Sequence, residues 1–211
     1  MMLDKRQEKI RSLVRKRQQR FSVILENVRD PHNIGAVMRT CDAVGIGELF
    51  IFNTQEPEEK SMVLGKRASS GARKWVDVYE FTDLARGMAF IKNKGYDQIW
   101  ATRIVPESKS LYEIDFTQNI VLMFGNEHKG ISDEAAAYTD GNFVIPQVGM
   151  VQSLNISVAC AVTLYEGYRQ RMVSGLYDKS GLTEAEQEEI FIKYAEREVM
   201  RFKGKNAIKL I

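Results

Sequence analysis

The chain has 211 residues, with 30 Lys and Arg, 28 Asp and Glu, and a net charge of +2, a length that suits one domain or one domain with arms. No apolar run approaches the ~18 residues that span a membrane, and the charged N-terminus argues against a signal peptide. Two cysteines, Cys41 and Cys160, form no Cys-x-x-Cys motif, so they are expected to be reduced core residues of a cytoplasmic protein.

The charge is unevenly distributed. Residues 1–20 hold eight Lys or Arg against two acids, residues 21–166 hold thirteen against nineteen, and residues 167–211 hold nine against seven. An acidic body between basic ends predicts that the ends hold a polyanion.

Residues 4–20 have helical composition, with Ile10, Leu13 and Val14 on one face. The segment is either a solvated docking helix or a nucleic-acid arm, because clustered Lys and Arg can replace the counterions of several phosphates. The acidic body favours the arm. Four arginines of this segment are predicted to contact RNA: Arg11, Arg15, Arg17 and Arg20.

A strand at residues 21–25, a polar loop, a helix from Ile34 and a strand at residues 48–52 form a β-loop-helix-β unit. This unit predicts parallel strands with a right-handed crossover, and ligand sites in parallel sheets gather where strands end. Asn33 is either a plain N-cap or a functional residue, and Arg39 is either a surface arginine or part of the same site.

Further strands are expected at residues 75–79, 98–103, 120–124 and 143–145, a helix at residues 82–94, and loops at residues 53–74 and 104–118. These elements alone predict an open, doubly wound α/β sheet. The fully apolar strand at residues 120–124 is of the kind that is buried on both faces.

The sequence Gly-Asn-Glu-His-Lys-Gly follows this strand at residues 125–130. Glycines that flank a polar tetrapeptide indicate a close approach of backbone to a ligand, although simple turn glycines are an alternative. The pattern matches neither the Walker motif nor Gly-x-Gly-x-x-Gly, so a nucleotide phosphate is not specifically indicated.

A nearly uncharged helix is expected from Ser153 to about Tyr168, with Ser153 as its N-cap. A helix that is apolar on every side is expected to be buried on every side. Ser153 and Asn155 would then lie at the mouth of a core element, where unpartnered polar groups are costly unless they bind something. This is a first indication of a site.

After the core, Arg169 and Arg171 are predicted to contact RNA, although solvated arginines are the alternative. A linker precedes a helix that Thr183 caps, and a basic tail ends the chain. His32 and His128 are too few for a metal site, and no cluster has ligand spacing, so no metal is predicted. His32 is expected to shape its loop and to contact RNA.

Three blocks together resemble one family. They are DPHNIGAVMRTCDAVG, IVLMFGNEHKGIS and FVIPQVGMVQSLNISVACAVTLYE, and they resemble, in order and spacing, motifs of the SpoU/TrmH branch of the SPOUT methyltransferases over roughly residues 20–170. The resemblance implies 2′-O-methylation of RNA ribose from S-adenosylmethionine without a metal, and a homodimer. It also implies a parallel α/β sheet, flanked by helices, whose C-terminal part is threaded into a trefoil knot.

The resemblance also assigns residues. It places Asn33, Arg39, Glu127, Ser153 and Asn155 at catalytic positions. Asn33 and Ser153 would fix the ribose and Arg39, Asn155 would order the cofactor loop, and Glu127 would hold neighbouring groups or face the sulfonium. Arg39 would be either a general base or a charged clamp on a phosphate. The expected cofactor-binding residues are Thr102, Gly125, Asn126, Glu127, Gly130, Ile145, Ser153 and Leu154.

The short basic extensions resemble those of the tRNA-modifying members. They imply a basic helical arm at residues 1–20, a methyltransferase domain at 21–168 and a C-terminal helical RNA-binding extension at 169–211. The expected substrate is the D-loop guanosine at position 18 of tRNA. The alternatives are a nucleotide of ribosomal RNA, or a catalytically silent RNA-binding protein.

Overall fold

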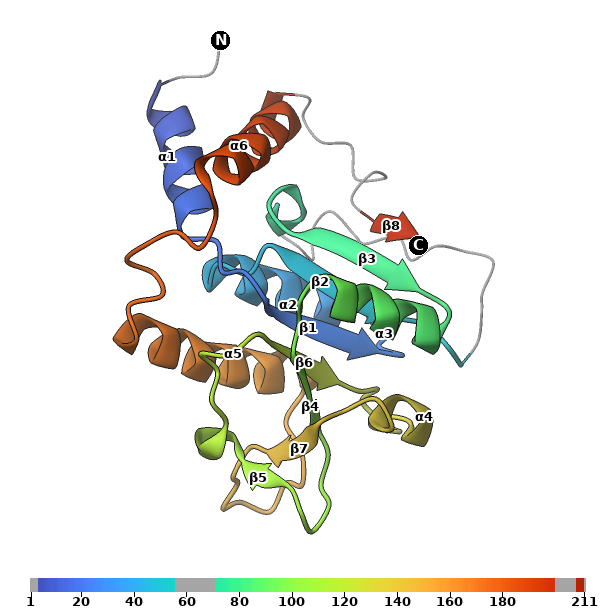
Figure 1. Ribbon diagram of the computed structural model, residues 1–211. Helices are drawn as coiled ribbons and strands as arrows, with labels where there is room; N and C mark the ends of the chain where they lie inside the picture. The colour runs from blue at the N-terminus through green and yellow to red at the C-terminus, as the bar shows by residue number, and fades with distance from the viewer. Residues whose placement is uncertain (1–3, 56–70, 200–207, 211) are drawn as a thin grey trace.

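The computed structural model describes residues 4–55, 71–199 and 208–210. Its centre is a parallel sheet of eight strands in the order β5-β7-β4-β6-β1-β2-β3-β8 (Figure 1). The strand bounds are β1 Phe21–Glu26, β2 Glu48–Phe52, β3 Asp77–Phe81, β4 Gln98–Thr102, β5 Lys109–Ser110, β6 Ile120–Phe124, β7 Gly141–Val144 and β8 Ile208–Leu210.

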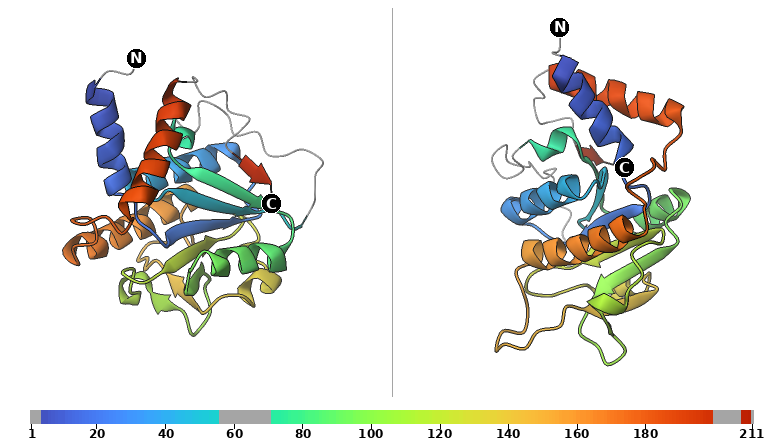
Figure 2. Two further views of the ribbon diagram at one scale, coloured as in Figure 1. Left: turned by 45° about the horizontal axis from the view of Figure 1, so that its top comes forward. Right: turned by 90° about the vertical axis from the view of Figure 1, so that its left-hand side faces the viewer.

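Helices cover both faces of the sheet. The helix bounds are α1 Asp4–Arg15, α2 Pro31–Ala43, α3 Leu84–Asn93, α4 Asp133–Ala136, α5 Ile156–Val173 and α6 Glu184–Val199, with 3₁₀ turns at Ala72–Lys74 and Leu111–Glu113. Figure 2 shows α2 and α5 side by side on one face, with α3 on the other. The elements alternate along the chain as an α/β fold requires.

Strand side chains divide between two apolar layers, because successive residues of a strand point to opposite faces. Ile120, Leu122 and Phe124 of β6 join the layer under α2 and α5, and Val121 and Met123 join the layer under α3. All five are fully buried or nearly so, so the prediction of a strand buried on both faces is confirmed.

The terminal helices α1 and α6 pack against each other at one end of the sheet (Figure 1). Their small core contains Ile10, Val14 and Tyr194. The guanidinium of Arg11 lies 3.8 Å from the ring centroid of Phe191 on α6. The N-terminal segment is therefore a docked helix in this structure. The sequence analysis considered this alternative but favoured a nucleic-acid arm.

Two helix starts differ from the sequence-based expectation. Asp30, not Asn33, caps α2, because its carboxylate accepts a hydrogen bond of 2.8 Å from the His32 backbone N–H and Pro31 is already suited to the first helical position. Asn155, not Ser153, caps α5.

The helix α5 is also longer and less buried than expected. It continues to Val173, and Val158, Val162 and Tyr165 are 47%, 36% and 53% exposed. The expectation that this helix is buried on every side is therefore wrong for the single chain.

Two predicted strands and one predicted helix cap agree with the structure, whereas one predicted loop differs. The strands at residues 48–52 and 120–124 match β2 and β6. The expected loop at residues 104–118 contains β5 and a short 3₁₀ turn. Thr183 caps α6, because its hydroxyl accepts a hydrogen bond from the Glu186 N–H at 3.3 Å. Most of the polar loop at residues 53–74, and most of the basic tail, lie outside the described residues.

Asp77 at the start of β3 joins the sheet to α6. Its carboxylate accepts a hydrogen bond of 2.6 Å from Arg197 and also pairs with Lys193. Burial by itself raises the pKa of Asp77, but the charges and hydrogen bonds of Lys193 and Arg197 lower it overall. The ionised carboxylate therefore stabilises the folded state.

We predict that this stabilisation is complete above the ordinary aspartate pKa of 3.8 and is lost as the pH falls below it, because the native pKa is the lower one. Asp77→Asn should reduce the free energy of unfolding by about 2 kcal/mol at pH 7, with a smaller loss near pH 3. Urea denaturation at both pH values measures this. An exposed control, Glu107→Gln, should match the wild type, and an equal loss from Asp77→Asn at both pH values would contradict the prediction.

Candidate active site

Three loops far apart in the sequence meet at the carboxyl edge of the sheet. The side-chain amide of Asn33 donates a hydrogen bond of 2.7 Å to Glu127, and its carbonyl accepts one of 3.3 Å from the amide of Asn155. Each of the three residues comes from a different motif. The structure thus brings together three of the five predicted catalytic residues.

Asn155 is held by its position as the N-cap of α5. Its side-chain oxygen accepts hydrogen bonds from the backbone N–H of Ser157 at 2.9 Å and from the Ser157 hydroxyl at 2.6 Å. The oxygen therefore satisfies a free donor of the first turn, and the NH₂ group is left to reach Asn33.

Asn33 is held by the burial of α2. Ile34, Val37, Met38 and Cys41 are fully buried on the side of the helix that packs on the sheet and α5. This packing fixes the rotation of the helix about its axis. Asn33, in the first turn, is consequently presented at the carboxyl edge of the sheet.

The loop at residues 125–130 is closed by its own backbone. Asn126 and Gly130 exchange two backbone hydrogen bonds of 3.0 and 2.9 Å. A Cβ at Gly125 would lie 2.3 Å from the carbonyl carbon of Gly130, and Gly130 has a φ of +68°. Both glycines are therefore required by the loop itself, and the tight loop presents Glu127 in an exposed position.

The Asn126 side chain anchors this loop from inside. Its oxygen accepts hydrogen bonds from the backbone N–H groups of His128 and Lys129 at 2.9 and 3.1 Å. Its NH₂ group donates one of 2.9 Å to the carbonyl of Asn27. Asn126, predicted to bind a cofactor, therefore also has a structural role, because it joins the 125–130 loop to the segment that follows β1.

Beneath these loops lies a buried carboxylate that the sequence reasoning missed. Glu26, at the end of β1, is 1% exposed and accepts hydrogen bonds of 2.6 Å from the Asn27 amide and 2.8 Å from the Ser132 hydroxyl. Asn27 has a φ of +53°. A charged residue directly after an apolar strand was the available signal, because such burial is costly unless the group is hydrogen-bonded.

Arg39 and Ser153 are the other two predicted catalytic residues, and they lie within α2 and in the loop before α5. Arg39 is exposed on α2, six residues after Asn33 and hence about 9 Å further along the helix axis. Ser153 is exposed in the loop that leads to Asn155. The hydrogen bonds that join Asn33, Glu127 and Asn155 define the candidate site.

The predicted cofactor residues lie at the ends of neighbouring strands. Thr102 ends β4, Gly125 follows β6 and Ile145 follows β7, and these strands are adjacent in the order β7-β4-β6, about 4.8 Å apart. Leu154 is half-buried beside Asn155. The exposed apolar side chain of Met150, at 99%, extends the same loop region. Backbone and apolar groups at three strand ends fit an adenosine moiety.

No group of three or more His, Cys, Asp or Glu side chains in the described ranges is arranged to hold a metal ion. Among the helices that the structure describes, none is long and apolar enough to span a membrane.

Two predicted RNA contacts are instead interior residues. Arg17, which is 4% exposed, donates to Tyr194, Asp42 and the carbonyls of Ile46 and Trp75 at 2.7 to 3.1 Å. A sequence cannot distinguish such an arginine from its exposed neighbours, because its protein acceptors are distant in the chain.

Arg171 is the second predicted RNA contact that lies in the interior. It is 3% exposed and donates to the carbonyls of Phe116 and Gln118 at 2.7 and 2.6 Å, with its guanidinium 4.5 Å from the ring centroid of Phe21. Burial lowers the pKa of Arg171 to about 10. It ties α5 to the segment before β6.

The other predicted RNA contacts lie at the surface. Arg11 pairs with Glu188 at 2.7 Å and Arg169 pairs with Glu166 at 2.7 Å, whereas Arg15, Arg20 and His32 are exposed. Exposed ion pairs are weak, so neither pairing prevents an exchange for phosphate.

The chain is similar to known proteins over most of its length. The model of the SpoU rRNA Methylase family matches residues 20–165. The chain is 37% identical to a tRNA (guanosine(18)-2′-O)-methyltransferase of Aquifex aeolicus, over 95% of this chain and 93% of the relative. The crystal structure of an A. aeolicus TrmH/SpoU tRNA modifying enzyme superposes with a TM-score of 0.84 at 37% identity, covering 94% of this chain and 99% of that one.

A ribosomal relative matches less fully. The 23S rRNA (guanosine-2′-O-)-methyltransferase RlmB of Xanthomonas axonopodis is 35% identical over 71% of this chain, and the match covers 59% of that relative.

Proposed function

We propose that this chain, which belongs to the SpoU rRNA Methylase family, is a tRNA methyltransferase. It methylates the ribose 2′-hydroxyl of guanosine 18, and S-adenosylmethionine is the methyl donor. The similarity to a tRNA (guanosine(18)-2′-O)-methyltransferase over nearly the whole of both chains supports this substrate. The observation that carries the proposal is the hydrogen-bonded set of Asn33, Glu127 and Asn155. With tRNA as its substrate, the protein is expected to act in the cytoplasm.

The reaction joins the ribose 2′-oxygen to a methyl carbon while the bond between that carbon and a sulfonium sulfur breaks, and the hydroxyl proton leaves to water or a protein group. S-adenosylmethionine supplies the already activated methyl group, so the protein must mainly align the reacting atoms. Alignment of this kind can contribute ~7 kcal/mol or more. Thr102, Gly125, Ile145 and Leu154 would hold the donor along the strand ends.

The polar triad would position the ribose. Asn33 holds Glu127 with its NH₂ group and Asn155 with its oxygen, so a ribose hydroxyl that enters the site meets side chains already fixed to one another. One Glu127 oxygen accepts the Asn33 hydrogen bond, and the other would face the ribose or the positively charged sulfonium. Ser153 would contact the ribose from the preceding loop.

Arg39 would act as a charged clamp on a substrate phosphate and on the developing negative charge of the oxygen. Removing a proton from an arginine side chain at pH 7 costs roughly 7.5–9 kcal/mol, so a general-base role is the less favourable alternative. A fixed positive group near developing charge contributes without proton transfer. The exposed position of Arg39 on α2 suits contact with an RNA backbone.

The exposed apolar positions on α5 support a homodimer. Val158, Val162 and Tyr165 follow one another at intervals of four and three residues, which places them on one side of the helix. An apolar stripe of this kind is normally covered by a partner, and a second copy of α5 would cover it. The trefoil knot is proposed on the family resemblance, and the position of β7 between β4 and β5 is compatible with it.

The proposed activity is tested with purified protein, labelled S-adenosylmethionine and an unmodified tRNA transcript. We expect one 2′-O-methylguanosine at position 18 by mass-spectrometric mapping, because the site is built for a ribose hydroxyl. Arg39→Ala should lower kcat/KM by at least about 100-fold, with partial activity in Arg39→Lys.

Three outcomes would contradict this account. Methylation of a ribosomal RNA fragment but not of tRNA would favour the ribosomal alternative. RNA binding without any binding of S-adenosylmethionine by calorimetry would favour a catalytically silent protein. Near-full activity of Arg39→Ala would remove Arg39 from either role.

The homodimer is tested with Val162→Asp, which places a charge in the α5 stripe. Sedimentation should show a dimer for the wild type and a monomer for the variant, because an unpaired charge in an apolar interface is costly. Ile192→Asp on α6, 50% exposed in the wild type, is the matched control and should remain dimeric. A monomeric wild type, or a dimeric Val162→Asp, would argue against this interface.

A further inference from the structure

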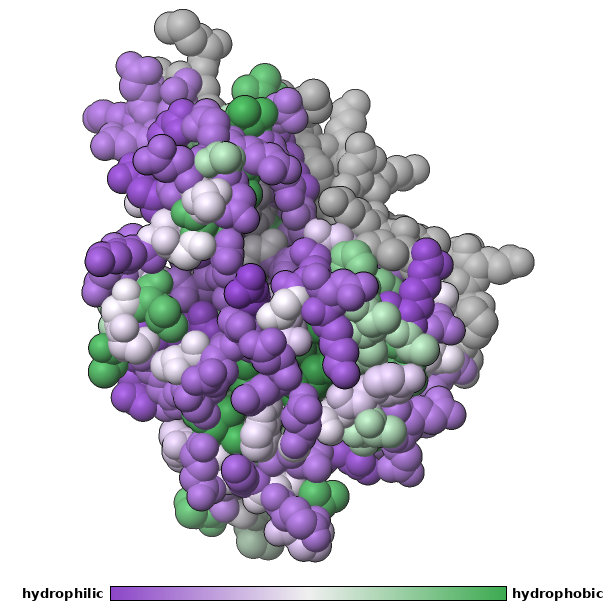
Figure 3. Space-filling view, in the orientation of Figure 1, coloured by the Kyte–Doolittle hydropathy of each residue, from purple (hydrophilic) through white to green (hydrophobic). Residues whose placement is uncertain are grey.

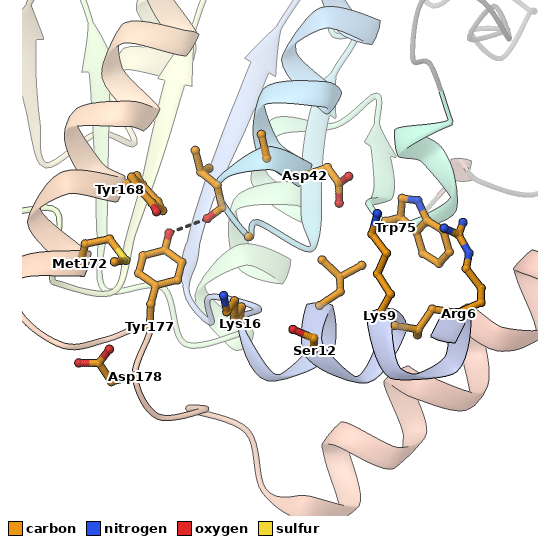
Figure 4. A pocket seen from close by; sticks show the side chains of 15 residues that line it. Arg6, Lys9, Ser12, Lys16, Asp42, Trp75, Tyr168, Met172, Tyr177 and Asp178 are labelled. Carbon is orange, nitrogen blue, oxygen red and sulfur yellow. Dashed lines mark hydrogen bonds between the residues drawn. The ribbon is translucent and has the colours of Figure 1, made fainter. Parts of the chain in front are cut away.

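A cavity of about 770 Å³ lies between α1, the end of α2 and the end of α5 (Figure 4). Lys9 of α1 and Lys16, directly after α1, line one side, and Tyr168 of α5 and Tyr177 of the following turn line another. Trp75 closes one end. The cavity lies at the carboxyl ends of α2 and α5, whereas the candidate active site lies at their amino ends.

The α1 wall of this cavity is basic. Lys5, Lys9 and Ser12 follow one another at intervals of four and three residues, so they share one side of α1, and Lys16 follows directly after the helix. All four are exposed, and Lys9, Ser12 and Lys16 line the cavity. Within the described part of the chain, the three lysines form no ion pair at salt-bridge distance. Hydrophilic side chains gather over α1 in the space-filling view (Figure 3).

The other faces of α1 are already engaged. Arg11 pairs with Glu188 on α6. Arg17, two residues after α1, lies in the interior and pairs with Asp42 at 2.9 Å. Asp42 and Asp178 are the acidic side chains among the residues that line the cavity. The lysine face is therefore a further basic surface that can receive an anion, in addition to the exposed arginines.

The opposite wall offers aromatic rings. Tyr168 and Tyr177 have ring centroids 5.1 Å apart, and the Tyr177 hydroxyl donates a hydrogen bond of 2.6 Å to the carbonyl of Val44, which fixes that ring (Figure 4). Nucleobases stack on such rings with little dependence on sequence.

We propose that this cavity binds an unpaired nucleotide of the RNA substrate, with its phosphates on Lys9 and Lys16 and its base against Tyr168. The inference rests on the proposed function. Cationic side chains facing aromatic rings across a groove are the combination that single-stranded nucleic acid requires. Tyr168 lies 13 residues beyond Asn155 on α5, or about 20 Å along the axis, so this nucleotide is not the one that is methylated.

The test compares the wild-type protein with a double variant that carries both Lys9→Gln and Lys16→Gln. Two lost phosphate contacts should weaken binding of an unmodified tRNA transcript about tenfold at moderate salt and reduce the slope of log affinity against log salt by ~1.4. KM for tRNA should rise in the same proportion, with kcat at saturating tRNA within about twofold. The matched control is a second double variant, with Arg86→Gln and Lys92→Gln on α3. It removes the same number of positive charges from another surface and should behave as the wild type.

The stacking contact is tested with Tyr168→Leu, which keeps an apolar side chain but removes the aromatic ring. Its affinity for the transcript should fall at least about fivefold with an unchanged salt slope. A thermal transition like that of the wild type in both variants would show that they are folded.

The proposal would be overturned if wild-type protein methylates tRNA and the lysine variant has the affinity and salt slope of the α3 control. A wild type that fails to methylate tRNA would instead refute the proposed function, so the two failures are distinguishable. If the lysine variant binds tRNA more weakly but Tyr168→Leu binds it normally, the phosphate contacts are supported and the stacked base is excluded.

Discussion

The side-chain amide of Asn33 is the connection on which the site depends. A primary amide carries both donors and an acceptor, so it can accept a hydrogen bond from Asn155 and donate one to Glu127 at the same time. These partners are 122 and 94 residues away in the sequence. A carboxylate at position 33 would face the carboxylate of Glu127 with like charge, and an apolar residue would leave both partners unjoined.

The fold supplies the rigidity that this bridge needs. Both α2 and α5 begin at the carboxyl edge of the sheet and pack against each other, and each start is fixed by a capping side chain, Asp30 or Asn155. Beneath them, the buried Glu26 joins Asn27 to Ser132. The polar surface is thus held from below by hydrogen bonds, so a ligand would meet groups that need little rearrangement.

The parallel α/β sheet and most strands could be predicted from the sequence, because the hydrophobic pattern determines these features. The meeting of the three motifs was predicted from the family resemblance. The sequence did not reveal which of two nearby polar residues caps α5, since Ser153 and Asn155 are both good caps and a tertiary contact selects between them. Nor did it distinguish the interior Arg17 and Arg171 from exposed arginines. The orientation of α1, which turns its lysines toward the cavity, depends on packing against α6.

The most direct test of the bridge is a double-mutant cycle in kcat/KM with Asn33→Ala, Asn155→Ala and the double variant. If the two amides act as one hydrogen-bonded unit, the double variant should lose about as much transition-state stabilisation as the more damaged single variant, with a coupling of roughly 1 kcal/mol or more. Losses that simply add would show that the two residues act independently and would contradict the account.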